Sequence, residues 1–178
     1  PNDAQVLILY GDVPLVSVTT LEELIEGAKE GLSLLMADVD DPTGLGRIIR
    51  DKQGEVIGIV EEKDATEQQR EIHEINSGIM AVKAGYLKKW LPKIQNNNQQ
   101  KEFYLTDIVA LAVKDNLPIL DFCPHYEWEI MGINNRSELA VAERIVQITQ
   151  AENLMRKGLT LFDPERFDLR GELEVGLD

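Results

Sequence analysis

Several residues that could take part in chemistry stand where strands are expected to end. Asp12, with the glycine before it, follows the apolar run 6–10. In open α/β sheets, ligands gather beyond the carboxyl ends of the strands, and a carboxylate there can hold a hard cation such as Mg²⁺. An aspartate just before Pro14 can equally cap a turn. The residues alone therefore leave a metal ligand and a structural turn both open.

Glycines, asparagines and charged residues form further candidates. In the stretch T-G-L-G-R, Gly44 and Gly46 flank one residue, so the backbone could approach a substrate, although a tight hairpin entry is the simpler explanation. Asparagines lie at element boundaries in the stretches 76–78 and 132–136. Asn often occupies caps and turns, but it also hydrogen-bonds sugar hydroxyls and can bind a metal through its oxygen. The charged run 61–64 is by itself typical of a solvated surface.

Nucleophilic and zinc chemistry find little support in the sequence. His73 and His125 have no partners at metal-ligand spacing, and no Cys–His arrangement is present. Cys123 is the only cysteine, and because it follows a strand-like run we expect a buried, unreactive thiol. A lone cysteine cannot form an intrachain disulfide, which favours a reducing compartment.

The composition bounds the class of protein. The chain has 178 residues, of which 43% are hydrophobic, and this suits one domain with a substantial core. Its formal net charge of -14 argues against binding to a nucleic-acid backbone, which requires basic patches. No apolar run approaches the ~18 residues that a membrane span needs, and no signal-peptide pattern opens the sequence.

The hydrophobic pattern predicts strands that alternate with helices around these candidates. We expect strands at 6–10, 32–39, 47–50, 55–61, 75–82, 118–123 and 128–133, and helices at 21–29, 66–71, 84–94, 106–114 and from 135 or 137 to about 157. This alternation predicts an α/β fold with a parallel or mixed sheet. Thr20 and Glu23 are expected to form the capping box of the first helix. Trp90, Phe103 and Tyr104 are expected in the core.

The succession of motifs resembles one protein family. The motifs L-Y-G-D-V-P-L, D-D-P-T-G-L-G-R-I, G-I-V-E-x-K-D-A, E-I-N-S-G-I, E-F-Y-L-T-D-I and G-I-N-N-R follow one another at natural spacing. Together they closely resemble the bacterial bifunctional N-acetylglucosamine-1-phosphate uridylyltransferase/glucosamine-1-phosphate acetyltransferase, from Val6 to about Gly176. The resemblance implies that UTP and N-acetylglucosamine-1-phosphate react to give UDP-N-acetylglucosamine and pyrophosphate. The resemblance also implies that the parent enzyme acetylates glucosamine-1-phosphate with acetyl-CoA and supplies UDP-N-acetylglucosamine for cell-wall synthesis.

The resemblance implies a metal and nucleotide-sugar site in two of the motifs. Tyr10, Gly11 and Asp12 match residues that contact the nucleotide-sugar, and Asp12 also matches a ligand of Mg²⁺. Asn134 matches the residue that joins this aspartate at the metal and at the substrate. Mg²⁺ is therefore the expected cofactor.

The resemblance implies a sugar site in the other motifs. Gly46, Glu61 and Asn76 match residues that hold the N-acetylglucosamine unit, and Thr106 lines the same pocket. Leu45 stands where the family has tyrosine, and Glu62 where histidine is commoner, but neither change removes one of these contacts. The expected catalytic roles are positioning and charge neutralisation, with no covalent catalytic residue.

The resemblance also predicts the domain organisation. Residues 1–136 would form the C-terminal half of a Rossmann-like uridylyltransferase domain, residues 137–160 a linker helix, and residues 161–178 the start of a left-handed β-helix. The long helix could instead simply cover the sheet. The UTP-binding motif L-x-A-G-x-G-T-R-M and the hexapeptide repeats of the acetyltransferase do not occur in the sequence. The isolated chain is therefore expected to be inactive, and the parent enzyme to be a homotrimer through its β-helix domain.

The expected partners are UTP, N-acetylglucosamine-1-phosphate and UDP-N-acetylglucosamine, in the cytoplasm, with no nucleic acid and no membrane. Two alternatives stay open. One is a nucleotidyltransferase for another sugar phosphate, and the other is a non-catalytic binding module on the same half-fold.

Overall fold

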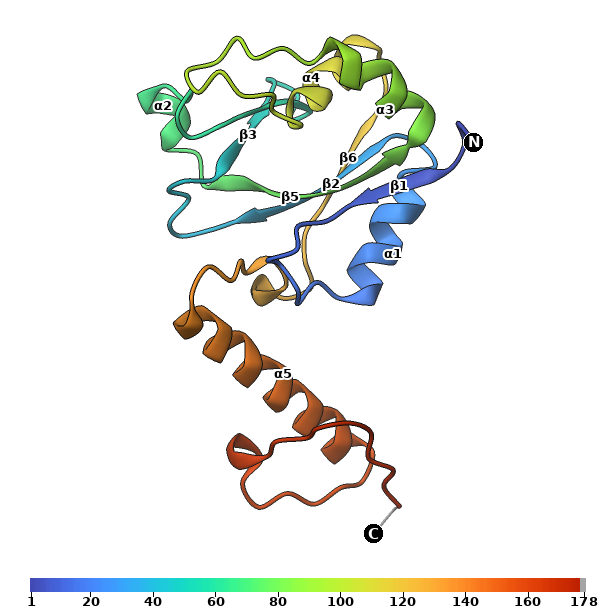
Figure 1. The fold of residues 1–178 in the computed structure, drawn as a ribbon, viewed down its shortest axis with the longest axis vertical. Helices are drawn as coiled ribbons and strands as arrows, with labels where there is room; N and C mark the ends of the chain where they lie inside the picture. The colour runs from blue at the N-terminus through green and yellow to red at the C-terminus, as the bar shows by residue number, and fades with distance from the viewer. Residues whose placement is uncertain (177–178) are drawn as a thin grey trace. The chain divides into compact units, whose positions relative to one another are not determined.

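The computed structural model describes residues 1–176 and divides the chain into two compact units (Figure 1). The first unit comprises Pro1–Gly11 and Val16–Ile130, and the second comprises Asp12–Leu15 and Met131–Asp178. Strands and helices alternate along the first unit, which confirms the expected α/β fold.

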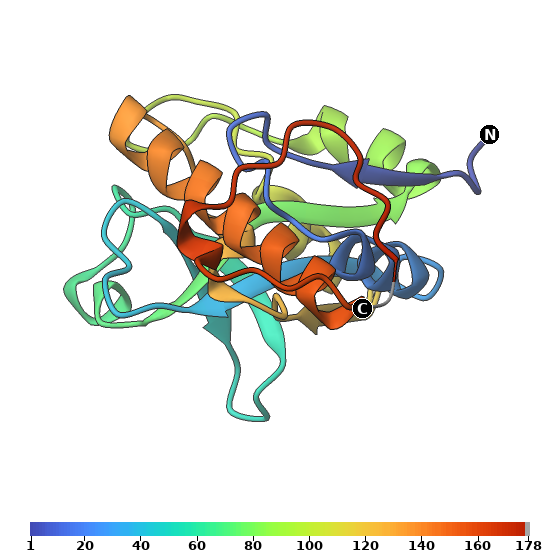
Figure 2. The same ribbon diagram turned by 90° about the horizontal axis from the view of Figure 1, so that it is seen from below.

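The first unit is built on a six-stranded mixed sheet. Its strands are β1 (Gln5–Ile8), β2 (Leu32–Asp38), β3 (Gly46–Arg50), β4 (Val56–Val60), β5 (Glu74–Lys83) and β6 (Ile119–Phe122). The order is β4-β3-β5-β2-β6, and β1 pairs with β5. Among the described strands, only β2 and β6 pair in parallel. Since β3 pairs with β5 only near its own start, the expected β3–β4 hairpin projects beyond the other strands (Figure 2).

Helices cover both faces of this sheet. They are α1 (Val18–Gly27), α2 (Glu67–Arg70), α3 (Ala84–Trp90) and α4 (Asp107–Lys114), with short 3₁₀ helices at Leu91–Lys93 (η1) and Glu127–Ile130 (η2). In Figure 1, α3 and α4 lie on one side of the sheet and α1 on the other. The alternating β2 residues Leu32, Leu34 and Met36 pack in one buried cluster with Trp90 and Ile108. The sheet is thus buried on both faces, as its long apolar strands predict.

The expected capping box of the first helix is wrong. Ser17 is the N-cap of α1, and its hydroxyl accepts the backbone N–H of Thr20 at 3.1 Å. The Thr20 hydroxyl instead donates to Glu129 at 2.6 Å. A partner distant in sequence therefore displaces the local cap that Thr20 and Glu23 could have made.

The expected strand at 128–133 is also wrong, because η2 occupies its first half. Glu129 is fully buried and accepts backbone N–H groups from Ser17 at 2.9 Å and Tyr126 at 3.1 Å. Burial alone would raise the pKa of Glu129, but the hydrogen bonds that its carboxylate accepts outweigh burial and lower the pKa. The carboxylate is thus ionised and fixes this turn to the start of α1.

Four further side-chain predictions have mixed outcomes. Trp90 is fully buried, as expected. Phe103 is 70% exposed, because it lies in the irregular segment between η1 and α4, and Tyr104 is half-buried. Cys123 is exposed rather than buried, because β6 is an edge strand that ends one residue before it.

The second unit consists mainly of α5 (Arg136–Arg156) and the segment that follows it. Asn135 caps α5 by accepting two backbone N–H groups, which confirms one of the two expected starts. The buried side chain of Gln147 donates to Asp168 at 3.2 Å, and Arg144 donates to the carbonyl of Glu165 at 2.5 Å. The chain after α5 therefore folds back along the helix. Within residues 1–176, no helix combines the length and the apolar character that crossing a membrane requires.

Candidate functional site

Three of the predicted sugar-site residues lie in one row across the sheet. Gly46 opens β3 and pairs with Asn76 of β5. Since Arg47 pairs with Val60 of β4, the next residue, Glu61, comes level with Gly46. A Cβ on Gly46 would lie 3.3 Å from Oε2 of Glu61. The absence of a side chain at Gly46 thus leaves space directly beside the Glu61 carboxylate.

Thr106 joins this row from the start of α4. Its hydroxyl donates to Oε1 of Glu61 at 2.8 Å, and the side chain is only 7% exposed. Although Thr106 is the N-cap residue, its side chain makes no hydrogen bond to its own helix. The hydroxyl therefore orients Glu61 instead of capping α4. We call Gly46, Glu61, Asn76 and Thr106 the polar cluster.

The amide oxygen of Asn76 is the unsatisfied atom of the polar cluster. Asn76 is 8% exposed, and its Oδ1 is buried without a hydrogen-bond partner among the described residues. Leaving a buried acceptor unpaired costs about 1–3 kcal/mol, and such atoms in native proteins usually mark a ligand, a water or strain. A ligand that donates a hydrogen bond would remove this cost.

Glu61 borders two hollows that are lined mainly by polar and charged residues. The larger, of about 350 Å³, is lined by Thr106, Tyr104, Asp64, Asp107 and the amide-rich loop residues Gln95, Asn97 and Asn98, among others. Burial, followed by the charge of Asp64, raises the pKa values of both Tyr104 and Asp107. The second hollow, of about 210 Å³, lies on the side of Gly44 and Lys63. Hydroxyl and amide groups of a sugar suit such a surface.

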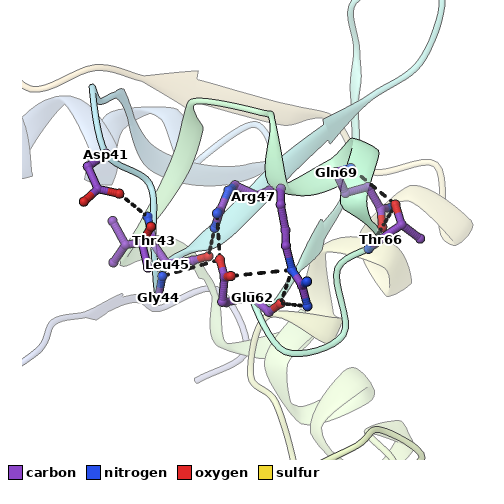
Figure 3. A network of polar contacts seen from close by, with 9 residues as sticks. Asp41, Thr43, Gly44, Leu45, Arg47, Glu62, Thr66 and Gln69 are labelled. Carbon is purple, nitrogen blue, oxygen red and sulfur yellow. Dashed lines mark hydrogen bonds and ion pairs between the residues drawn. The ribbon is translucent and has the colours of Figure 1, made fainter.

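A partly buried ion pair joins the residues that follow Gly46 and Glu61 (Figure 3). Nη2 of Arg47, a residue only 1% exposed, lies 2.6 Å from Oε2 of Glu62. The same guanidinium donates through Nη1 to the Leu45 carbonyl. The hydrogen bond from Arg47 is the main cause that lowers the pKa of Glu62. The ion pair therefore links the segment that carries Gly46 to the segment that carries Glu61. Glu62 thus has a specific partner, unlike a residue of a fully solvated surface.

Tyr10 and Gly11 follow β1, which ends at Ile8. The Tyr10 side chain is 49% exposed, and its ring packs over Gly78 of β5, where a Cβ would lie 1.8 Å from Cε2. Gly11 is exposed, and a Cβ there would meet no atom within 4 Å. The described surroundings of Gly11 thus do not demand a glycine, whereas those of Gly78 do.

The remaining two predicted site residues, Asp12 and Asn134, belong to the second unit. The backbone N–H of Ile133 donates to the Asp12 carbonyl at 2.8 Å, so the two segments lie side by side. Both Asp12 and Asn134 are exposed. The Asn134 backbone N–H donates to Glu138 at 2.6 Å, and this bond is the main cause that lowers the pKa of Glu138.

The donor set of the Asp12–Asn134 pair fits Mg²⁺. A carboxylate oxygen and an amide oxygen are hard ligands, and Mg²⁺ usually takes only one or two ligands from protein, with water and phosphate supplying the rest. Among residues 1–176, no group of three or more His, Cys, Asp or Glu is arranged to hold a metal. A cation at this pair would therefore depend on water and substrate for most of its coordination.

Sequence reasoning missed Arg47 and Glu62 as a pair, and Gly78 as a contact of Tyr10. The signal for Gly78 was present, because an isolated glycine within a strand pattern indicates a bulge or a close backbone approach. No local signal identifies the ion pair, since Arg47 lies in β3 and Glu62 follows β4, and only strand pairing brings them together.

No protein-family model matches the chain, but curated relatives match nearly all of it. A protein of Alkalilimnicola ehrlichii is 51% identical over 178 residues, which cover 100% of this chain and 38% of the relative. A protein of Acinetobacter baumannii is 54% identical over 179 residues, covering 100% of this chain and 39% of the relative. A protein of Nitrosospira multiformis is 55% identical over 174 residues, covering 97% of this chain and 38% of the relative. All three are named "Bifunctional protein GlmU".

This chain thus spans about two fifths of the length of these relatives, at 38% to 39%. Identity above one half along nearly every residue of the chain requires common descent. The chain is therefore homologous to this part of the proteins named "Bifunctional protein GlmU".

Proposed function

We propose that this chain is the sugar- and metal-binding part of a uridylyltransferase, which forms UDP-N-acetylglucosamine and pyrophosphate from UTP and N-acetylglucosamine-1-phosphate. Its homology to part of proteins named "Bifunctional protein GlmU" supports the reaction class. The observation that carries the proposal is the unpartnered amide oxygen of Asn76, buried beside Glu61 and Thr106.

The polar cluster would bind the sugar. The Glu61 carboxylate accepts hydrogen bonds from sugar hydroxyls, and the Thr106 hydroxyl holds one of its oxygens in place. The Asn76 oxygen accepts a hydrogen bond from the sugar, which would relieve its unpaired state. Gly46 leaves room for the sugar beside the carboxylate.

The Asp12–Asn134 pair would hold Mg²⁺ through the carboxylate and the amide oxygen. When bound, the cation supplies charge neutralisation to the phosphates. This contribution matters because the chain itself carries a formal net charge of -14 while its proposed substrates are anions. The substrate phosphates would complete the coordination that the two side chains leave open.

The reaction would be an in-line displacement on the α-phosphorus of UTP. Such a step depends on positioning and electrostatic stabilisation more than on covalent chemistry. In the first unit, the polar cluster would orient the sugar; in the second, Asp12 and Asn134 would hold the cation that neutralises the phosphates.

The proposal includes the domain assignment made from the resemblance. Residues 1–136 would be half of the uridylyltransferase domain, 137–160 a linker helix and 161–178 the entry to the β-helix acetyltransferase. The parent enzyme would be a cytoplasmic homotrimer that also uses acetyl-CoA.

The experiment that tests the proposal measures release of pyrophosphate by the full-length protein that carries this chain. With UTP and Mg²⁺, N-acetylglucosamine-1-phosphate should be a substrate, whereas glucose-1-phosphate should react poorly because it lacks the acetamido group. Equal rates with the two sugar phosphates would favour the alternative of another sugar specificity. Absence of turnover with every sugar phosphate would overturn the enzyme proposal in favour of a binding module. The 178-residue chain alone should be inactive, and synthesis by it would contradict that expectation.

A further inference from the structure

The central strand β5 carries an irregularity just after Asn76. The pairs of β2 with β5 on either side of it are Leu34 with Met80 and Met36 with Asn76. One β2 residue, Leu35, therefore faces the stretch 77–79 of β5. Such bulges in a sheet are built features, often found next to active sites, where they redirect a side chain.

Ser77 satisfies the backbone groups that the bulge would leave unpaired. Its hydroxyl donates to the Leu35 carbonyl at 2.7 Å and accepts the backbone N–H of Ile79 at 3.2 Å. Without this side chain, two polar groups in the middle of the sheet would lose their partners, at a cost in stability. The Ser77 side chain thus stabilises the irregular backbone of the bulge.

Gly78 is the residue of the bulge that touches Tyr10. Its φ of +82° lies in the region that side chains rarely adopt. A Cβ at this position would also lie 1.8 Å from Cε2 of Tyr10, 2.6 Å from Cζ and 2.7 Å from Cδ2. Backbone conformation and the Tyr10 ring therefore each require glycine here.

The bulge separates two parts of the same edge of β5. β3 pairs with β5 at residues 75–76, whereas β1 pairs with residues 80–83. Gly78 lies between these two stretches, two positions after Asn76 in the sequence. The Tyr10 ring packs over Gly78. The form of the bulge thus determines how far the Tyr10 ring lies from Asn76 and the polar cluster.

We infer that the Ser77–Gly78 bulge is a positioning element that seats the Tyr10 ring, so that Tyr10 and Asn76 contact the same ligand. Gly78 acts through Tyr10 and is a positioning residue. The inference rests on the proposed function, in which that ligand is the sugar phosphate and its nucleotide-sugar product. It assigns a role to the two residues that follow Asn76 in the motif E-I-N-S-G-I.

Gly78→Ala tests whether the bulge positions the Tyr10 ring, and Gly54→Ala is its matched control. Gly54 has a similar φ of +91°, but a Cβ there would meet no atom within 4 Å. In the full-length protein, we expect Gly78→Ala to raise the KM for N-acetylglucosamine-1-phosphate by at least about tenfold, because displacements near 1 Å can be that costly. Its effect on kcat should be smaller, since the ring contacts the bound ligand and not the reacting atoms. Gly54→Ala should leave both constants unchanged.

A double substitution separates positioning from a general disturbance of β5. If Gly78→Ala acts by displacing the ring, it should add nothing to the KM of Tyr10→Ala, because no ring remains to displace. If it acts through the strand as a whole, the two effects should multiply, and the inference would be wrong. If the positive φ at Gly78 prevents Gly78→Ala from folding, Ser77→Ala tests the same bulge: it should also raise the KM, and an unchanged KM would overturn the inference.

The position of the ring is also measurable without substrate. In the full-length protein, 3-fluorotyrosine labelling gives one ¹⁹F signal for each tyrosine, and Tyr10→Phe identifies the one of interest. Gly78→Ala should shift that signal, whereas Gly54→Ala should not. An unshifted signal in Gly78→Ala would contradict the inference that the bulge positions the Tyr10 ring. Lack of turnover in the unsubstituted protein would overturn the proposed function and this inference together. Normal turnover with an unchanged KM in Gly78→Ala would overturn the inference alone.

Discussion

The polar cluster and the Asp12–Asn134 pair differ in what fixes their side chains. In the polar cluster, Asn76 and Thr106 are 8% and 7% exposed, and Glu61 is hydrogen-bonded by a neighbour. The side chains of Asp12 and Asn134 are exposed, and the bond that joins their segments is made by backbone atoms.

This difference suits two kinds of ligand. A sugar is recognised by several directional hydrogen bonds, so its binding groups gain from being fixed before the ligand arrives. A phosphate-bound cation brings most of its own coordination, so the protein needs to supply only a few oxygen atoms. Substitutions in the cluster should therefore affect binding and stability together, whereas substitutions in the pair should affect activity alone.

The largest expected effect comes from Asp12→Ala. Loss of the carboxylate should lower kcat/KM of the full-length protein by about a thousandfold, since a metal supplies several kcal/mol of charge stabilisation. A higher Mg²⁺ concentration should restore part of the rate. The melting temperature should not change, because Asp12 is exposed. Asp3→Ala, at another exposed aspartate, is the control, and unchanged Mg²⁺-dependent turnover in Asp12→Ala would remove the metal assignment.

Thr106→Val should act on the cluster by about one to two orders of magnitude. Valine keeps the shape of threonine but leaves Oε1 of Glu61 without its donor, and a hydrogen bond to a charged group is worth about 1.5–3 kcal/mol. The KM for N-acetylglucosamine-1-phosphate should rise accordingly. Thr106→Ser keeps the hydroxyl and should restore KM. A serine variant as impaired as the valine variant would show that packing, and not orientation of Glu61, is what Thr106 provides.

Much of the scaffold was predictable because its signals are local. The apolar run of β2, the glycine and polar residues of the β3–β4 turn, and the Asn135 cap each act within a few residues. The same locality explains the errors. Thr20 was assigned to a local capping box, but Glu129 binds its hydroxyl from 109 positions along the chain.

The candidate site was predictable only through the order of its motifs. From composition and spacing alone, the simplest interpretation of Asn76 was a turn or cap residue, and that of Glu61 was part of a solvated surface. Their proximity depends on strand register, since Gly46 lies between them in the sheet although it precedes both in sequence. The contact of Gly78 with Tyr10 depends on register as well. Register is specified by the whole buried face of a sheet, which a single motif does not reveal.

Asn76→Leu should change stability and binding together, but in opposite directions. The leucine removes the buried oxygen that lacks a partner, so the ligand-free chain should become more stable by about 1 kcal/mol. At the same time, the KM for the sugar phosphate should rise by roughly tenfold, because the expected hydrogen bond to the ligand is lost. Asn96→Leu, at an exposed loop position, should change neither quantity. A destabilised Asn76→Leu chain would indicate that Asn76 has a structural role and would weaken the proposal.

The smallest expected effect is on the pH dependence of stability. It concerns two carboxylates, one next to the polar cluster and one next to the Asp12–Asn134 pair. The pKa of Glu62 is lowered mainly by the hydrogen bond from Arg47, and that of Glu138 mainly by the backbone N–H of Asn134. A carboxylate with a lowered pKa stabilises the folded chain above its usual pKa, near 4.5 for Glu, and this stabilisation is lost as the pH falls through the lower folded value. Unfolding free energy should therefore decrease with acidification below about pH 4.5, and less so in Glu62→Gln and Glu138→Gln.

Carbon-13 titration of the glutamate carboxyls measures the two groups directly. Both midpoints should lie below the usual glutamate value, and Arg47→Met should return the Glu62 midpoint toward that value while leaving Glu138 unchanged, because their hydrogen-bond donors are different. Glu22→Gln, at an exposed position of α1, is the stability control. If Arg47→Met left the Glu62 midpoint unmoved, the ion pair would not hold the ends of β3 and β4 in solution. The contrast between a cluster fixed by side chains and a pair fixed by backbone would then lose its strongest element.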